Sequence, residues 1–206
     1  MLAFLDTEFT DLAVWPRLLS VGLVTDHGSD REFYAEVTDP DRIDATHRFG
    51  RGVVLPQFGK VADAACTYAE LGARLSAFLH DMVANLRLNE CVELAFGYHL
   101  DWELIDRAMM EAVPATWKPT RRRIRPVNVH EIASSGPGHL AADAYFKAQA
   151  TAPLSRHHAL CDARALRLAY EAGARESVRL NRPPMVSERK FDGRHFRQHD
   201  LQFAHD

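Results

Sequence analysis

Short apolar runs separated by turn residues mark the start of the chain, a pattern typical of β-strands. Residues 2–6 are apolar and end at a carboxylate, and residues 18–25 form a second run of apolar and β-branched residues. After a turn at residues 26–28, residues 31–37 alternate between polar and apolar positions, as a half-buried strand does. This order predicts three antiparallel strands at the N-terminus.

An amphipathic segment follows, after a connection over residues 38–62 whose prolines and glycines favour irregular structure. Thr67 and Glu70 have the spacing of a capping box, in which two side chains satisfy each other's backbone donors at a helix start. Apolar residues then recur at helical spacing, at Leu71, Leu75, Phe78, Leu79, Met82 and Leu86. We therefore predict a helix over residues 67–87.

The second half of the chain alternates between strand-like and helix-like segments. The predicted strands cover residues 92–98 and 125–129. The predicted helices cover residues 101–113, 139–150 and 158–172, with Pro114 and Pro119 ending the first, a loop over 134–138 before the second, and Gly173 capping the third. Three strands, a helix and then strand–helix alternation predict an α/β protein, with a mixed β-sheet flanked by α-helices.

Composition narrows the class of protein further. The chain has 206 residues, of which 47% are hydrophobic and 26% charged, which suits one globular domain with a sizeable core. Its apolar runs are too short to span a bilayer, so no membrane partner is expected. Without a secretory leader pattern or a Cys-x-x-Cys pair, the sequence favours a cytoplasmic protein with reduced thiols. A net charge of −3 excludes binding of nucleic acid through bulk charge, although local basic stretches remain.

The end of the chain differs from the rest. Beyond residue 181 the sequence is polar and shows neither a helical nor a strand period. We therefore expect a folded domain over residues 1–180 and a polar C-terminal tail or extension over residues 181–206.

Four carboxylates lie at the ends of the predicted elements. Asp6 and Glu8 lie where the first strand runs out, and an i, i+2 pair on a strand points to one face. Asp101 follows a predicted strand, and Asp162 lies in the last helix, five residues after His157. Converging carboxylates repel one another strongly and need neutralising cations, and hard oxygen ligands select Mg²⁺ or Mn²⁺.

The spacings within this set also arise by chance. Asp30-x-Glu32 repeats the first pair, and His195 repeats the histidine spacing with Asp200. Taken alone, the first pair fits a solvated strand end, and an aspartate at a helix start fits an N-cap. The informative signal is the order of the whole set: Asp-x-Glu at the first strand, an aspartate at a strand-to-helix junction, and a histidine with an aspartate at the last helix. Such a set suits phosphoryl displacement, in which two ions hold the attacking and leaving oxygens and a histidine accepts a proton.

Three segments that carry these residues are similar to the motifs of the DEDDh 3′–5′ exonucleases. They are FLDTEFT at residues 4–10, YHLD at residues 98–101 and HHALCDA at residues 157–163. The resemblance covers about residues 1–175 and implies a ribonuclease-H-like fold. The early stretch most resembles the bacterial ribonuclease AS-like branch.

The resemblance implies a two-metal mechanism. Asp6, Glu8, Asp101 and Asp162 would hold two Mg²⁺ ions, for which Mn²⁺ can substitute, and His157 would be the general base. The implied reaction releases nucleoside 5′-monophosphates from the 3′ end of single-stranded nucleic acid, with RNA favoured over DNA. Several members of this family are homodimers, so the resemblance leaves both a monomer and a homodimer as alternatives.

The sequence indicates the residues that contact the substrate less directly than the metal ligands. The resemblance implies that Phe9 and Thr10 lie beside the 3′-terminal nucleotide. The chain departs from the family pattern at Asp11, where a glycine is common, and in the region Phe96-Gly97-Tyr98, where many members carry His-Asn. An arginine run offers either phosphate contacts or a solvated surface, and the residues concerned are Arg121, Arg122 and Arg123. Trp102 could stack on a base or belong to the core.

Two other functions remain open on the sequence alone. One is a catalytically inactive nucleic-acid-binding module of the same fold. The other is a phosphodiesterase that acts on small nucleotides.

Overall fold

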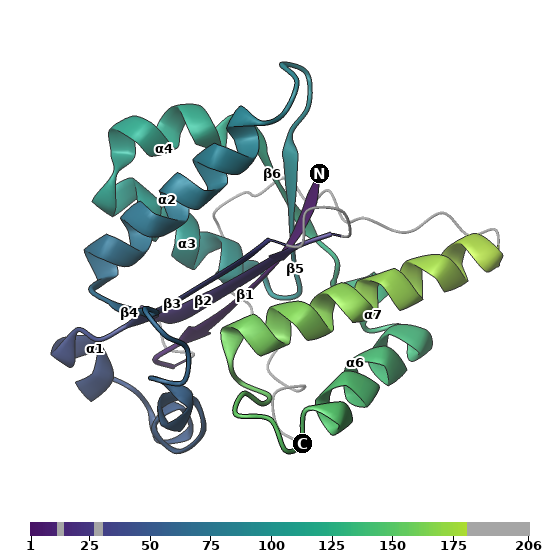
Figure 1. Ribbon diagram of the computed structural model, residues 1–206, viewed down its shortest axis with the longest axis horizontal. Helices are drawn as coiled ribbons and strands as arrows, with labels where there is room; N and C mark the ends of the chain where they lie inside the picture. Colours follow the sequence, from purple (N-terminus) through teal and green to yellow (C-terminus); the bar gives the residue numbers. More distant parts are fainter. Residues whose placement is uncertain (12–14, 27–30, 181–206) are drawn as a thin grey trace.

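The computed structural model describes residues 1–11, 15–26 and 31–180 (Figure 1). The predicted C-terminal tail, residues 181–206, lies outside the described residues, and so do Asp30, His195 and Asp200.

A six-stranded mixed sheet forms the centre of the molecule, in the order β4-β3-β2-β1-β5-β6. The strands are β1 (Leu2–Phe9), β2 (Leu18–Thr25), β3 (Glu32–Val37), β4 (Ala65–Cys66), β5 (Val92–Phe96) and β6 (Ile124–Asn128). The first three strands are antiparallel, as predicted, whereas β5 runs parallel to β1 and β6 runs parallel to β5. The short β4 pairs parallel with β3 and was not predicted.

Helices cover both faces of this sheet, which confirms the predicted α/β architecture (Figure 1). One face carries α2 (Tyr68–Ala84), α3 (His99–Ala112) and α4 (Pro114–Arg121), and the other carries α7 (Ala159–Arg179) with α6 (Gly136–Ala148) packed against it. Within the described ranges, none of the helices has the length and apolarity that crossing a membrane requires.

The alternation of side chains along β1 divides the core into two. Ala3 and Leu5 belong to the larger core beneath α2 and α3, whereas Phe4 packs with Leu160 on the face that α7 covers. Because residues two apart on a strand share a face, Asp6 and Glu8 lie on the α7 side with Phe4. The strand period therefore fixes which helix can reach the two carboxylates.

The first strand is longer than predicted. β1 pairs with β2 as far as Phe9, with an irregularity in register between Glu8 and Phe9. Asp6 and Glu8 consequently lie within the strand rather than just beyond it. Backbone pairing with the neighbouring strand extends β1 past the point where its apolar run stops.

Two prolines, Pro114 and Pro137, lie in the first turn of a helix, contrary to the prediction. Pro114 is the first residue of α4, where the missing N–H group costs nothing. The stretch expected to be a loop contributes the first turn of α6, whose N-cap Ser135 accepts a hydrogen bond from the backbone of Gly138. The predicted capping box of α2 is confirmed, with Thr67 and Glu70 bonded to each other's backbone.

Gly173 lies inside a helix rather than at its end, because α7 continues to Arg179. A Cβ atom at Gly173 would lie 2.1 Å from the backbone oxygen of Ile132. The glycine is therefore explained by the close approach of α5 (His130–Ala133) to α7, and not by a C-cap.

The connection over residues 38–62 is more regular than predicted. It contains α1 (Pro40–Asp44), one turn of π-helix, η1 (Gly50–Val54), and a 3₁₀ turn, η2 (Leu55–Gln57). Each is five residues or shorter, so none spans enough turns to show an amphipathic period.

Candidate active site

The start of α7 lies directly on the sheet beside the acidic residues of β1. Asp6 is paired across the strands with Gly22 of β2. A Cβ atom at Gly22 would lie 2.2 Å from the carbonyl carbon of Ala159, so only glycine allows the backbone of α7 to come this close. This contact brings Asp162, in the first turn of α7, over β1.

Asp101 reaches the same place from α3. Since β1 and β5 are parallel, their carboxyl ends meet at one edge of the sheet, and α3 begins just after β5. The Asp101 carboxylate is 3% exposed. It accepts a hydrogen bond of 2.7 Å from the Thr7 hydroxyl and one of 3.3 Å from the backbone N–H of Tyr98. These bonds orient the carboxylate independently of any ion.

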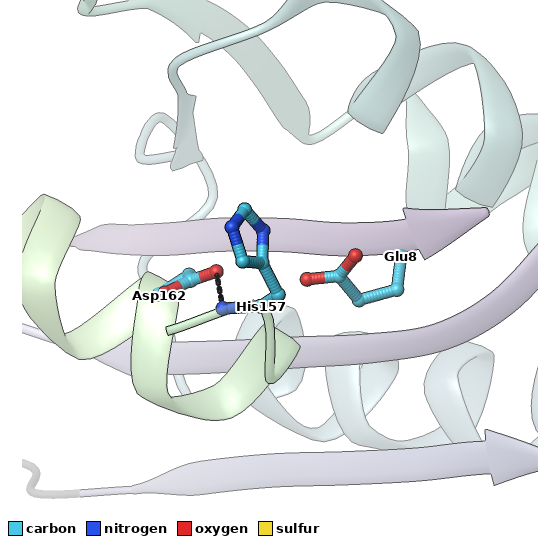
Figure 2. Close-up of side chains that lie close together, drawn as sticks. All are labelled: Glu8, His157 and Asp162. Atoms are coloured by element: carbon cyan, nitrogen blue, oxygen red, sulfur yellow. Dashed lines mark hydrogen bonds between the residues drawn. The ribbon is translucent and has the colours of Figure 1, made fainter. Parts of the chain in front are cut away.

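Glu8, His157 and Asp162 lie close together in the cluster (Figure 2). Each offers one potential ligand atom, and the three atoms lie within 4.8 Å of one another. One oxygen of Asp162 accepts the backbone N–H of His157 at 2.9 Å. Its other oxygen, Oδ1, is buried and has no hydrogen-bond partner among the described residues. A buried, unpaired carboxylate oxygen is costly unless a cation or a proton satisfies it.

The four carboxylates perturb one another electrostatically. Burial, reinforced by Asp101, Asp162 and Glu8, raises the pKa of Asp6 well above its usual value. Burial and the charges of Asp162 and Asp101 likewise raise the pKa of Glu8. Burial raises the pKa values of Asp101 and Asp162 as well. Buried carboxylates that resist ionisation together are stabilised when cations neutralise them.

The segment that carries His157 is held by a residue distant in sequence. Gln57 is 4% exposed, and its amide nitrogen donates to the carbonyl oxygens of Arg156 and His157 at 2.9 and 3.0 Å. Its amide oxygen accepts from the backbone N–H and the hydroxyl of Ser155, both at 3.0 Å. His157 has a φ angle of 65°, a left-handed conformation that costs a non-glycine residue about 1–2 kcal/mol. The Gln57 contacts offset this strain.

The two adjacent histidines occupy different environments. His157 is half-buried, with the Phe49 ring edge-on to it at 4.9 Å between centroids. Burial and the nearby Arg156 lower the pKa of His157, so its imidazole is neutral near pH 7. His158 is 2% exposed and stacks on Tyr34 at 4.3 Å, and burial lowers its pKa to about 4. Only His157 belongs to the acidic cluster.

Phe9 and Thr10 lie at the end of β1, immediately beyond the carboxylates. Phe9 is partly buried against the larger core. Thr10 is 3% exposed, and its hydroxyl accepts the backbone N–H of Arg17 at 3.1 Å while its carbonyl accepts that of His47 at 2.9 Å. Thr10 thus joins two loops beside the site, and its contact with substrate stays a prediction.

The arginine run does not act as one unit. The Arg123 guanidinium donates to backbone carbonyls at the end of α2 and in the following loop, so its donors hold that loop. Arg121 pairs with Asp106 at 2.7 Å and lies 5.4 Å above the ring of Trp102, which is only 7% exposed. Arg121 and Arg122 line an open hollow of about 410 Å³ on the α3–α4 surface. Trp102 is packed in the core, where its face meets Arg121.

Three residues of the site were not predicted from the sequence. Gly22, inside an apolar strand, carried a signal, because an interior glycine marks close approach of another backbone. Thr7 lies on the opposite face of β1 from its acidic neighbours and had no distinguishing pattern. Gln57 lies about 100 residues from the segment it holds, and only the folded chain brings them together.

Comparison with known proteins supports the fold. No family model and no curated protein matches this chain. Among solved structures, it is similar to the nuclease domain of 3′hExo, a DEDDh family member bound to rAMP, with a TM-score of 0.51, 12% identity and coverage of 91% of this chain and 96% of that one. A full-length 3′-exonuclease gives a TM-score of 0.51 and 12% identity, covering 90% of this chain and 84% of that chain. The predicted ribonuclease-H-like fold is thereby confirmed, whereas similarity to the ribonuclease AS-like branch stays a prediction.

Proposed function

We propose that this protein is a metal-dependent 3′–5′ exonuclease that releases nucleoside 5′-monophosphates from the 3′ end of single-stranded nucleic acid. The observation that carries the proposal is the convergence of four carboxylates from β1, α3 and α7 with a half-buried, neutral histidine. The shared fold with DEDDh nuclease structures supports it.

The donor set fits divalent cations. Asp6, Glu8, Asp101 and Asp162 offer hard oxygen ligands, and one oxygen of Asp162 is buried without a partner. We propose that these four residues hold two Mg²⁺ ions, or Mn²⁺ in their place. When bound, such ions neutralise the phosphate and stabilise charge on the attacking and leaving oxygens.

His157 acts as the general base in this proposal. Its lowered pKa leaves the imidazole unprotonated at neutral pH, so it can accept a proton from the attacking water. The water oxygen forms a bond to phosphorus, and the bond from phosphorus to the 3′ oxygen breaks. The 3′ oxygen takes a proton from solvent, so the shortened strand leaves with a new 3′ hydroxyl and the terminal unit leaves as a 5′-monophosphate.

A basic surface lies on α3 and α4, over the residue that follows Asp101. Arg121 lies over Trp102, the neighbour of Asp101, and Arg122 lines the same hollow. We propose that these guanidinium groups contact phosphates of the bound strand. RNA is favoured over DNA because the early stretch of the sequence most resembles the ribonuclease AS-like branch.

The test is digestion of 5′-labelled single strands of RNA and DNA, with Mg²⁺ or Mn²⁺ and with EDTA. A ladder of products that shortens from the 3′ end and requires metal is expected. Endonucleolytic products, or a ladder that persists in EDTA, would overturn the proposal. A chromogenic phosphodiester in parallel separates a small-nucleotide phosphodiesterase, and strand binding without cleavage identifies an inactive binding module.

Variants make the assignment specific. Asp6→Asn and Asp162→Asn should each abolish most of the activity, because each removes a metal ligand. Glu32→Gln is the matched control: Glu32 lies on β3 and pairs with Arg164 at 2.6 Å, outside the cluster. If Glu32→Gln were as damaging as Asp6→Asn, the site assignment would be wrong.

A further inference from the structure

A second hollow, of about 290 Å³, combines arginines with an exposed indole. Trp15 is 78% exposed, whereas Trp102 and Trp117 are buried. Arg17, Arg42 and Arg107 line the hollow with it. We call this surface the Trp15 hollow.

Two elements, β1 and α3, connect the Trp15 hollow with the proposed catalytic cluster. On β1, Thr10 follows Glu8 by two residues, about 7 Å of strand, and its backbone N–H donates to the carbonyl of Arg17. On α3, Arg107 follows Asp101 by six residues, about 9 Å of helix. A strand whose 3′ end reaches the carboxylates would have its next nucleotides within reach of this hollow.

Local contacts orient the three arginines. The Arg107 guanidinium donates to the carbonyl of Pro16 at 2.7 Å, which also fixes the residue next to Trp15. Arg17 pairs with Asp41 at 2.8 Å, and Arg42 lies 3.6 Å above the ring of Tyr68. Each guanidinium carries five N–H donors, so the bonds described leave further donors for a phosphate. Glu111 also lines the hollow, and the arginines outnumber the acids around it.

Exposed aromatic residues occur in both segments that meet Thr10. Phe49 is 44% exposed and lies against His157, and its loop meets Thr10 through the bond between the His47 N–H and the Thr10 carbonyl. Trp15 lies two residues before Arg17, whose carbonyl accepts the backbone N–H of Thr10. Exposed aromatic faces among cations are the usual platform for unpaired bases.

We propose that the Trp15 hollow binds a nucleotide of the single-stranded substrate upstream of the terminal one. The base stacks on Trp15, and a backbone phosphate is held by Arg17 and Arg107. This inference rests on the proposed exonuclease function. It assigns a subsite that makes affinity depend on strand length.

Binding is tested first, independently of cleavage. Eight-nucleotide strands of RNA and DNA are added in EDTA and in Ca²⁺, with anisotropy of a 5′ label reporting affinity and acrylamide quenching reporting the exposed indole. Bound strand should shield the wild-type protein from quenching, because Trp102 and Trp117 are already buried. Trp15→Ala should weaken the affinity roughly 5- to 100-fold, the range expected for one lost base stack. Trp15→Phe should restore most of it.

Strand length separates this subsite from the catalytic cluster. Trp15→Ala and Arg107→Gln should lower kcat/KM on an eight-nucleotide strand. They should leave hydrolysis of the p-nitrophenyl ester of a nucleoside 5′-monophosphate unchanged, because this substrate has no upstream nucleotide. Leu88→Ala and Arg87→Gln are matched controls, because both residues are exposed and precede β5, at the edge of the sheet opposite the carboxylates.

The outcomes distinguish the two proposals. If the wild-type protein digests strands and Trp15→Ala does so equally well at every length, the subsite is refuted while the exonuclease function stands. If no strand is bound or digested, both fail. If Trp15→Ala instead turns a dimer into a monomer in light scattering, without changing strand affinity, the hollow contacts a second copy and the subsite is refuted.

Discussion

Two adjacent histidines, chemically identical in the sequence, occupy different environments in the structure. We expect His157→Ala to keep metal and strand binding but to lose ~10²–10⁴-fold in turnover, the usual worth of a general base. His158→Ala should mainly destabilise the protein, because it removes a ring that is 2% exposed and stacked on Tyr34. Single-turnover hydrolysis at saturating Mg²⁺ measures the first effect, and thermal unfolding measures the second.

Equal losses of turnover in the two histidine variants would contradict the general-base assignment. A His157→Ala defect that additional metal repairs completely would contradict it too, since the residue would then act as a ligand.

Gln57 is expected to act on the reaction only through His157, as a positioning residue. In Gln57→Glu, a carboxylate oxygen would face the carbonyls of Arg156 and His157 in place of the donating amide. We expect stability to fall by ~1–3 kcal/mol, the usual cost of unpaired buried groups. We also expect kcat to fall by up to ~10²-fold, as for other small misplacements of reacting groups, with metal affinity unchanged.

The matched control for this change is Gln149→Glu, the same substitution at the end of α6. To separate positioning from mere destabilisation, kcat and KM are measured well below the unfolding temperature of each variant. A Gln57→Glu enzyme with normal kcat there would show that the contact is structural only.

At the scale of elements, the position of α7 on the sheet depends on one missing side chain. A Cβ atom in Gly22→Ala would meet the backbone of Ala159 at 2.2 Å, and backbone cannot yield as a flexible side chain can. We expect a loss of at least ~1–3 kcal/mol in stability, as for other overpacked cores. Activity should fall as well, because α7 carries Asp162 and moves away from Asp6.

Gly52→Ala is the control for the glycine experiment, since a Cβ atom there meets nothing within 4 Å. Chemical denaturation gives the stability of both variants, and metal titration gives the affinity of the site. Near wild-type values for Gly22→Ala would mean that the close approach of α7 is not required.

Local signals explain which elements the sequence could predict. The capping box of Thr67 and Glu70 and the long apolar period behind it identify α2, and alternation identifies β1 to β3. Short elements such as α1 and η1 are too short to show a hydrophobic period. Proline is also ambiguous in a sequence, because it occurs both after the end of one helix and in the first turn of the next. Gly173 is ambiguous in the same way. A glycine is required there because a side chain would collide with the backbone oxygen of Ile132 on another helix, and not because the helix ends.

At the scale of the whole molecule, the acidic residues could be predicted but their supports could not. Asp6, Glu8, Asp101 and Asp162 stand in short motifs that follow one another in a fixed order, and a sequence shows such motifs directly. The contacts that hold the site join β1 to α3 through Thr7, and the 3₁₀ turn η2 to the start of α7 through Gln57. Such contacts cross long stretches of chain and follow only from the packed topology.

The acidic cluster should also govern how the stability of the metal-free protein depends on pH. Because burial and mutual repulsion raise the pKa of Asp6 and its neighbours, the folded state binds more protons than the unfolded state above about pH 4. The free energy of unfolding therefore falls as pH rises through the raised pKa values, for this set of groups. His157 and His158 act in the opposite direction, since their lowered pKa values make stability rise with pH.

The difference between the wild-type protein and Asp6→Asn isolates the carboxylate contribution, because both contain the same histidines. In EDTA, Asp6→Asn should gain stability relative to the wild type as pH rises from about 4 to 8, since it lacks one of the four repelling charges. Saturating Mg²⁺ should stabilise the wild type more than the variant and so reverse the order. Thermal unfolding at several pH values, with and without Mg²⁺, measures both effects. The difference in stability between the two proteins in EDTA could instead stay constant as pH rises. The carboxylates would then ionise without repelling one another, and the need for cations inferred from their convergence would be refuted.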